Sequence, residues 1–419
     1  MTLSSNSQSL RALLTMFCLM FAGEVIFSLP FHLTRFFRPT ALAGFGLSNS
    51  ALGDIFAVYG VTAMLAYFPG GALADRYSTR ALLTISLVAT AAGGLYLATL
   101  PSAHGMAWLY GYWGVTTILL FWAALIRGTR EWGGEHTQGR AFGFLDGGRG
   151  LIAAGLASIA VLLLQAEPIS ADGTLTTAAR AVALQHLIYF YSAMTAAAGI
   201  LCWFAIPVPH QRAERSHSSL SFSVLRQPNL WLQALVVIAA YCGYKSLDYY
   251  TLYARDMLGM SEVDAARFGA ATAYLRPLLA ITAGWLADRF RASSVTAALF
   301  ALGAASYLLL PWNHWPALLY ANVLVTIAVI YGLRGIYFAL LGESAVPAEH
   351  TGTAVGFISV LGYTPDVFFA PLAGRLLDQA PGAPGYRHLF LLLLAIFIGG
   401  GCAIVVLRRR LMRHALLNA

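Results

Sequence analysis

The feature that most constrains this chain is a series of long apolar segments separated by short polar stretches. A helix needs about 20 mostly apolar residues to cross roughly 30 Å of hydrocarbon. Twelve segments of the 419-residue sequence meet that criterion. They cover residues 11–34, 51–73, 81–100, 106–128, 140–165, 184–206, 229–254, 264–287, 295–311, 317–342, 353–377 and 388–407. Because helices satisfy their own backbone polar groups, the sequence predicts an all-α integral membrane protein with twelve transmembrane helices.

Composition supports this fold class and excludes others. The chain is 58% hydrophobic and 11% charged, with a mean hydropathy of +0.68, whereas a soluble domain is about half apolar and a quarter charged. These values exclude a soluble enzyme, a disordered chain and a nucleic-acid-binding protein. The net charge of +8 comes from arginines beside the apolar segments. Most of these arginines lie on the side of the N-terminus, which predicts that both termini are cytoplasmic.

No motif in the sequence predicts a cofactor, a metal site or an ATP site. All four cysteines, Cys18, Cys202, Cys242 and Cys402, lie inside apolar segments, so we expect neither disulfides nor thiolate metal ligands. The sequence has no G-x-x-x-x-G-K-[ST] loop, which argues against direct ATP drive.

The two halves of the chain repeat each other. The segment Gly71–Arg76 (GALADR) returns as Gly284–Arg289 (GWLADR), 213 residues later. Gly139–Phe144 (GRAFGF) returns as Gly352–Phe357 (GTAVGF) at the same spacing of 213 residues. Two matches at one spacing indicate a duplicated unit of six helices.

The polar stretch between the sixth and seventh spans divides these repeats. We therefore predict an N-terminal six-helix bundle at 1–206, a cytoplasmic linker at 207–228 and a C-terminal six-helix bundle at 229–419. The two bundles are expected to be pseudo-symmetric.

These features resemble the major facilitator superfamily of secondary transporters. The resemblance extends over nearly the whole chain, and its signature is the G-x-x-x-D-R motif between spans two and three, with a weaker copy between spans eight and nine. In the family this loop brackets the cytoplasmic gate. The resemblance assigns gate roles to Gly71, Asp75, Arg76 and Arg80, and to Gly284, Asp288 and Arg289 of the second copy. Ser78 and Thr79 depart from the usual pattern, and the motif residues could alternatively be turn residues and topology anchors.

Several predicted spans carry charged residues, which are costly in a bilayer and therefore indicate function. The candidate functional charges are Glu24, Asp146, Arg149, Lys245, Asp248, Arg276, Arg334 and Asp366. Spans 3, 6, 9 and 12 carry none. In the resembled family those four helices are outer supports and the other eight surround a central cavity, so we expect a wet, charged cavity between the bundles.

The cations in the spans predict recognition of an anion. A guanidinium presents a planar donor fork suited to carboxylate or phosphate, so Arg149 with Arg276 or Arg334 could clamp one anionic group. Lys245, the only lysine, could contact the substrate or form a switchable ion pair. Tyr241 and Tyr244 lie beside it and could orient a polar solute.

The four acids among these candidate residues could couple transport to protons. Glu24, Asp146, Asp248 or Asp366 could load a proton and release it when an arginine approaches. Glu24 is favoured because no opposite charge lies within four residues of it. A purely structural interpretation stays open. Asp146 with Arg149, and Lys245 with Asp248, are three residues apart and could neutralise each other, or all eight charges could form interdomain salt bridges.

The sequence therefore predicts a transporter, not an enzyme, that moves a small polar and anionic organic solute by alternating access in symport with protons. By resemblance to bacterial carriers, we expect a monomer in the bacterial inner membrane, with the solute, protons and lipid as its partners. A proton-driven exporter of small molecules or drugs is the alternative, although Gly147–Leu151 lacks the proline of the family's efflux motif. A membrane-embedded enzyme or receptor is a further alternative, without a catalytic pair to support it.

Overall fold

The computed structural model describes residues 2–134, 138–168, 175–207, 227–312, 315–343 and 351–417, and they are almost entirely helical. The chain forms two compact units. The first comprises Met1–Arg212 and Asp248–Pro277, and the second comprises Ala213–Leu247 and Leu278–Ala419. Residues 208–226, most of the predicted linker, lie outside the described residues, so the predicted domain boundaries remain predictions.

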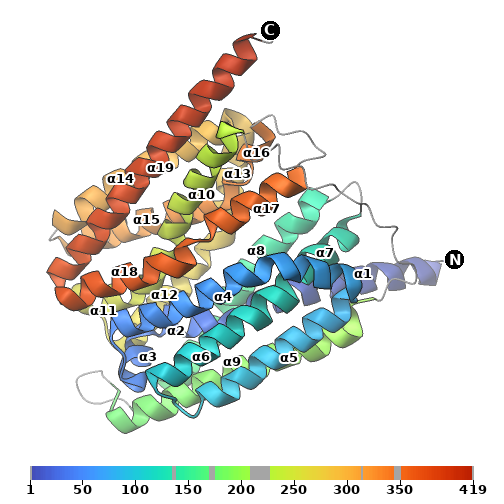
Figure 1. The fold of residues 1–419 in the computed structure, drawn as a ribbon. Coiled ribbons are helices and arrows are strands. Elements are labelled where there is room, and N and C mark those ends of the chain that lie inside the picture. The colour runs from blue at the N-terminus through green and yellow to red at the C-terminus, as the bar shows by residue number, and fades with distance from the viewer. Residues whose placement is uncertain are drawn as a thin grey trace. The chain divides into compact units, whose positions relative to one another are not determined.

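The first unit is built mainly from helices of the first half of the sequence. Its elements are α1 (Thr2–Val25), η1 (Ser28–His32), α2 (Leu33–Phe36), α3 (Arg38–Phe45), α4 (Asn49–Arg76), α5 (Thr79–Leu97), α6 (Ala103–Gly114), η2 (Val115–Trp122), α7 (Ala123–Gly133), α8 (Gln138–Gln165), α9 (Thr177–Ala205), α11 (Tyr250–Leu258) and α12 (Glu262–Ala273). α5 packs along α9, α4 packs along α6, and α1 packs on α8 and α9. Figure 1 shows α5 and α9 side by side.

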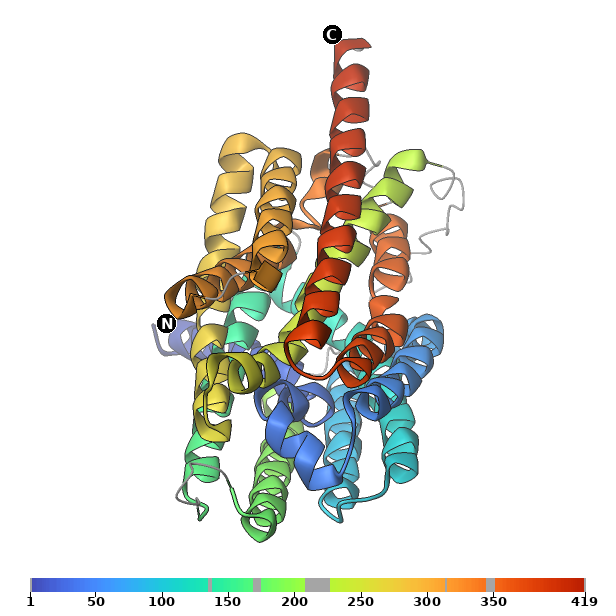
Figure 2. The ribbon, with the colours of Figure 1, turned by 90° about the vertical axis from the view of Figure 1, so that its left-hand side faces the viewer.

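The second unit contains the remaining helices. They are α10 (Pro228–Ser246), most of α13 (Leu275–Phe290), α14 (Ala292–Leu309), η5 (Leu310–Trp312), α15 (Pro316–Ile336), α16 (Leu340–Glu343), α17 (Thr351–Gly362), α18 (Pro365–Gln379) and α19 (Ala383–Leu417). The short η4 (Leu247–Tyr249) joins α10 to α11. α19 packs on α14 and α10 and forms the long red helix that leads to the C-terminus in Figure 2.

The helices match the predicted membrane spans. Within the described residues, eleven helical segments are long and apolar enough to cross a membrane. The predicted span at 264–287 is the one that is absent from these eleven, and there α12 ends at Ala273 and α13 begins at Leu275. The architecture is therefore that of a twelve-helix membrane protein, with its eighth span broken at Tyr274.

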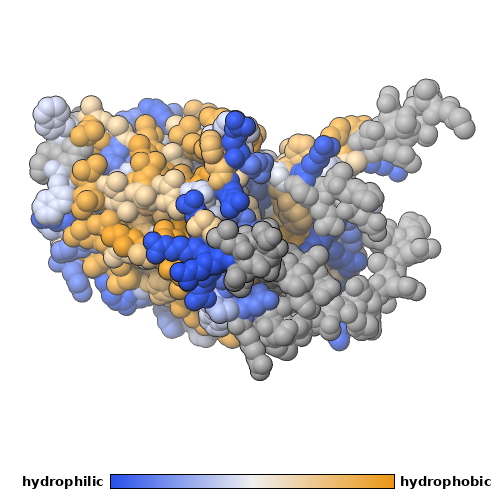
Figure 3. Space-filling view, turned by 90° about the horizontal axis from the view of Figure 1, so that it is seen from above, coloured by the Kyte–Doolittle hydropathy of each residue, from blue (hydrophilic) through white to orange (hydrophobic). Residues whose placement is uncertain are grey.

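Burial follows the pattern of a membrane protein. Large apolar side chains such as Phe204, Trp315 and Leu65 are 72–80% exposed, and Figure 3 shows broad hydrophobic patches on the face that it views. Charged side chains such as Glu24 and Lys245 are instead buried. Lipid accommodates the exposed apolar surface, and the charges avoid lipid by facing other helices.

Candidate functional site

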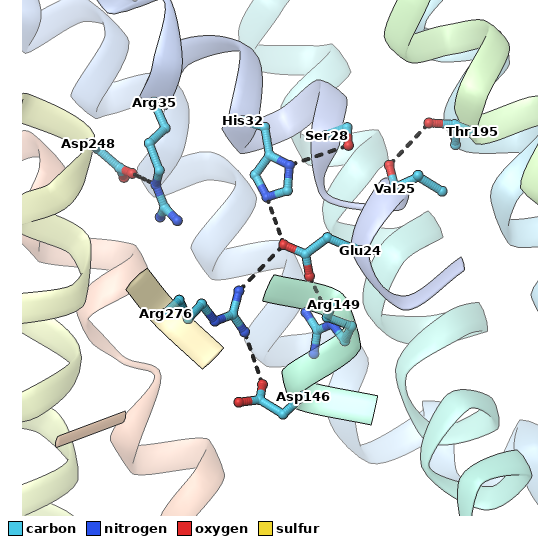
Figure 4. Close-up of polar contacts among 10 residues, drawn as sticks. All are labelled: Glu24, Val25, Ser28, His32, Arg35, Asp146, Arg149, Thr195, Asp248 and Arg276. Atoms are coloured by element: carbon cyan, nitrogen blue, oxygen red, sulfur yellow. Dashed lines mark hydrogen bonds and ion pairs between the residues drawn. The ribbon is translucent and has the colours of Figure 1, made fainter. Parts of the chain in front are cut away.

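Five ionisable side chains meet inside the first unit, and we call them the Glu24 cluster: Glu24, His32, Asp146, Arg149 and Arg276 (Figure 4). Glu24 lies in the last turn of α1, and His32 ends η1. Asp146 and Arg149 are one turn apart on α8, and Arg276 lies in the first turn of α13. Spans 1, 5 and 8 thus contribute to one polar site.

The Glu24 carboxylate is the centre of this cluster. Its Oε2 accepts a hydrogen bond from Nε of Arg149 at 2.9 Å, and its Oε1 lies 3.5 Å from Nη1 of Arg276. The Glu24 side chain is 2% exposed. The fifth and eighth spans therefore place two guanidinium groups on one buried carboxylate, the arrangement expected of an anion clamp.

His32 and Asp146 complete the cluster. Nε2 of His32 lies 3.3 Å from Oε1 of Glu24, the same oxygen that faces Arg276. Nη2 of Arg276 donates to Oδ1 of Asp146 at 2.9 Å. The Asp146 side chain is 42% exposed, whereas that of Arg276 is 7% exposed, so Asp146 is the accessible member of the cluster.

A break in the first span positions Glu24 and His32. Pro30 lacks a backbone N–H and cannot continue regular α-helical bonding, and the chain adopts the π-helical turn η1 there. Two side chains from other helices satisfy backbone carbonyls at the break. Thr195 Oγ1 donates to the carbonyl of Val25 at 3.1 Å, and the Tyr110 hydroxyl donates to the carbonyl of Pro30 at 3.0 Å.

Small and aromatic residues shape the surroundings of Arg149. A Cβ at Gly23 would lie 3.2 Å from Cδ of Arg149 and 3.1 Å from Leu125, so the glycine permits the close approach of the Arg149 stem to α1. The guanidinium carbon of Arg149 lies 5.8 Å from the ring centre of Phe27 and 5.9 Å from that of Trp122. Ring faces at this distance attract a cation.

A second cluster of predicted site residues lies inside the second unit. Lys245 Nζ lies 3.2 Å from Oδ1 of Asp366, and the Tyr241 hydroxyl lies 3.1 Å from each carboxylate oxygen of Asp366. The guanidinium of Arg334 lies 4.3 Å from the ring centre of Tyr244. The rings of Tyr241 and Tyr244 stack with centroids 5.9 Å apart. We call these five residues the Lys245 cluster.

Asp248 belongs to the first unit, whereas the Lys245 cluster belongs to the second. Asp248 receives a hydrogen bond from Nε of Arg35 at 2.5 Å, and Figure 4 shows this pair beside the Glu24 cluster. A second buried pair joins Nη2 of Arg180 to Oε1 of Glu262 at 2.6 Å. Both pairs attach the stretch Asp248–Pro277 to the helices of the first six spans.

The motif residues predicted for the cytoplasmic gate are mostly exposed. Asp75, Arg76, Asp288 and Arg289 are exposed, and among the described residues none of them forms an ion pair. The guanidinium of Arg80 lies 4.6 Å from the ring centre of Trp203. A Cβ added at Gly71 or at Gly284 would meet no heavy atom within 4 Å.

Sequence reasoning missed His32, Arg35, Arg180 and Glu262 as members of polar contacts. Arg35 and Arg180 lie just outside the predicted spans 11–34 and 184–206. Arginines at such positions indicate only the orientation of the chain in the membrane. His32 was not among the charged residues of the spans, because histidine is counted as neutral at pH 7. The signal that could have identified His32 is its position two residues after Pro30 and eight after Glu24 in an apolar segment.

Comparisons with known proteins show the family of this chain. The family model described as Major Facilitator Superfamily matches residues 12–370. The chain belongs to the Major Facilitator Superfamily. It is 30% identical to the inner membrane protein YqcE of Escherichia coli (strain K12), with 92% of each chain covered. It is 26% identical to a probable nitrate/nitrite antiporter, NarK1, of Thermus thermophilus, covering 64% of this chain and 60% of that protein.

A solved structure shows the same fold. The crystal structure of a bacterial homologue of the human lysosomal transporter Spinster, in an inward-facing and unoccupied conformation, superposes with a TM-score of 0.72 at 12% identity. The alignment covers 97% of this chain and 98% of that chain. The protein is thus a multi-pass inner membrane transporter of the Major Facilitator type.

Proposed function

We propose that this transporter moves a small anionic organic solute across the inner membrane by alternating access, in symport with protons. The observation that carries the proposal is the pair of buried arginines, Arg149 and Arg276, held on the single carboxylate of Glu24. Two buried guanidinium groups that face one point form a binding site for an anion. The Glu24 carboxylate is the anionic group bound there in this structure.

The geometry suggests how an anion enters this site. A solute carboxylate or phosphate offers the acceptor atoms that Glu24 now offers, so the solute and Glu24 compete for the same donors. Arg149 comes from the first half of the sequence and Arg276 from the second, so an anion bound to both couples the two repeats. Lys245, Arg334, Tyr241 and Tyr244 form a separate candidate substrate site within the second unit, where the cations supply positive charge and the tyrosines supply ring faces and hydroxyls.

Proton coupling follows from the same competition. Neutralising the Glu24 carboxylate weakens its hold on both arginines and leaves them free for the solute. Asp146 is the second acceptor of Arg276 and keeps that arginine near the site. Asp248 and Asp366 are engaged with Arg35 and Lys245, and they serve as further proton acceptors when those pairs open.

The two copies of the G-x-x-x-D-R motif are proposed to form the cytoplasmic gate. Asp75 and Asp288 would gain partners when the transporter closes there, with Arg76, Arg80 and Arg289 as the basic members of the two motif copies. We further propose that the transporter acts as a monomer with both termini in the cytoplasm.

Anion exchange is the second candidate function, and the distant similarity to the probable nitrate/nitrite antiporter favours it. In an exchanger, Glu24 would hold the arginines only between the departure of one anion and the arrival of the next, and no proton would be required. A proton-driven exporter would use the same acids in the opposite direction.

Reconstitution into proteoliposomes separates these functions. A panel of nitrate, phosphate, D-gluconate and D-glucose 6-phosphate, with uncharged D-glucose as control, is offered under an imposed pH gradient. Symport predicts accumulation that collapses with a protonophore. Exchange predicts uptake only into vesicles preloaded with an anion, and an exporter predicts extrusion. If no probe moves in any format, the proposal of an anionic solute is wrong.

A further inference from the structure

We propose that His32 is the residue that binds the coupled proton. Its protonated ring then replaces Arg276 as the hydrogen-bond partner of the Glu24 carboxylate. This inference rests on the proposed proton symport and assigns its proton to the imidazole ring of His32. The residue lies at the break of the first span and is 4% exposed.

The first argument is position. His32 Nε2 and Arg276 Nη1 face the same oxygen of Glu24, at 3.3 Å and 3.5 Å. Neither distance is as short as the 2.9 Å contact of Arg149 with the other oxygen. One oxygen thus has two donors in competition. When the ring becomes doubly protonated and cationic, its Nε2–H makes a charge-assisted bond to that oxygen, which weakens the hold of Glu24 on Arg276.

The second argument is charge. Glu24 and Asp146 balance Arg149 and Arg276, so the cluster has no net charge while His32 is neutral. A monovalent anion added to this buried site would leave one uncompensated negative charge, which costs several kcal/mol away from water. One proton on His32 removes that imbalance. The anion and the proton therefore favour each other's binding.

The third argument is chemistry. Histidine is the side chain whose ordinary pKa lies closest to physiological pH. The charged groups that face His32 are Glu24, Arg276 and Arg35. Arg35 is paired with Asp248 at 2.5 Å. Nδ1 of His32 lies 3.3 Å from the Ser28 hydroxyl, which orients the ring and leaves Nε2 directed at Glu24.

NMR of protein that carries nitrogen-15 in its histidine rings tests the protonation of His32 directly. The only ligand added in this experiment is the proton itself, through the change in pH. The His32 signal is assigned by its loss in His32→Gln and followed from pH 8.5 to pH 5. We expect the ring to change from the neutral to the doubly protonated form in this interval, and the change to shift in Glu24→Gln. A ring that stays neutral throughout would overturn the proposal, whether or not the protein transports any anion.

Transport provides the second readout. With an anion from the panel above, wild-type protein under a gradient of one pH unit should accumulate the solute up to about tenfold for one proton per anion. His32→Gln should lower that ratio to about one. Full accumulation in this variant would also overturn the proposal. If wild-type protein moves no anion, the proposed function fails, and the NMR titration alone decides whether His32 binds the proton.

His186→Gln is the matched control. His186 also pairs with a glutamate, since its Nδ1 lies 2.6 Å from Oε1 of Glu167, but its side chain is 55% exposed and lies outside the Glu24 cluster. We expect wild-type accumulation in this variant. Loss of accumulation in both variants would show that removing any such histidine damages the protein, which would contradict a specific role for His32.

Discussion

At the scale of the residue, the buried carboxylate of Glu24 shows how a membrane protein tolerates charge. Glu24 is 2% exposed and has cationic or potentially cationic partners from three other parts of the chain. Removing one partner of a buried pair leaves the other charge uncompensated, whereas removing both often costs little. The Glu24 cluster therefore stabilises the fold only as a complete set, which also keeps its donors ready for another anion.

This leads to a prediction for the Glu24–Arg149 pair. Arg149→Gln should lower the free energy of unfolding by about 3–5 kcal/mol, and the double variant Glu24→Gln/Arg149→Gln should recover part of that loss. Thermal unfolding in detergent measures both variants. As a control, disrupting the half-exposed pair of Arg127 and Glu131 should change stability by only about 0.3–0.5 kcal/mol. Additive losses in the double variant would contradict an energetic coupling between Glu24 and Arg149.

At the scale of the element, most of the candidate charges lie where the spans are broken, whereas Asp146 and Arg149 lie within the continuous helix α8. Glu24 and His32 flank the break between α1 and η1, Lys245 and Asp248 flank the start of η4, and Arg276 follows the turn at Tyr274. Asp366 lies at the start of α18, directly after the break that follows α17. Broken helices expose backbone polar groups, which are tolerated at membrane depth only inside protein or beside water.

Packing around the second π-helical turn, η2, permits another prediction. Gly114 ends α6, and a Cβ there would overlap Oγ1 of Thr62 and lie 2.9 Å from the backbone oxygen of Tyr59. Gly114→Ala should therefore push α6 from α4 and destabilise the fold by about 1–3 kcal/mol. Gly111→Ala, on the same helix, would meet Val58 at 3.4 Å and should leave the melting temperature almost unchanged. Equal melting temperatures for the two variants would show that α4 and α6 do not pack this closely.

At the scale of the whole molecule, the compact units do not coincide with the repeats of the sequence. The stretch Asp248–Pro277 belongs to the second repeat, yet it groups with Met1–Arg212. The buried pairs Arg35–Asp248 and Arg180–Glu262 supply part of that attachment. Ion pairs formed after folding, and not position in the sequence, thus decide which unit this stretch joins.

Orientation in the membrane is a prediction at this scale. In a Cys402→Ser background, Ala103→Cys should react with an impermeant maleimide added to intact cells, because the loop before α6 is predicted to lie on the outer side of the inner membrane. Ala419→Cys should react only after the membrane is permeabilised, because the predicted C-terminus is cytoplasmic. The opposite labelling pattern would reverse the predicted topology and the assignment of the gate.

The sequence by itself determined the membrane fold, the duplication and the set of charges that lie inside the spans. Hydrophobic length, repeat spacing and the cost of a charge in lipid are local properties, and they can be read along the chain. Only the tertiary structure decided which charges meet. Glu24 and Arg149 lie 125 residues apart, and Arg35 and Asp248 lie 213 apart, so no helical periodicity connects them. The helix breaks and His32 were likewise decided by packing, because a π-helical turn depends on partners such as Thr195 and Tyr110 that neighbouring helices supply.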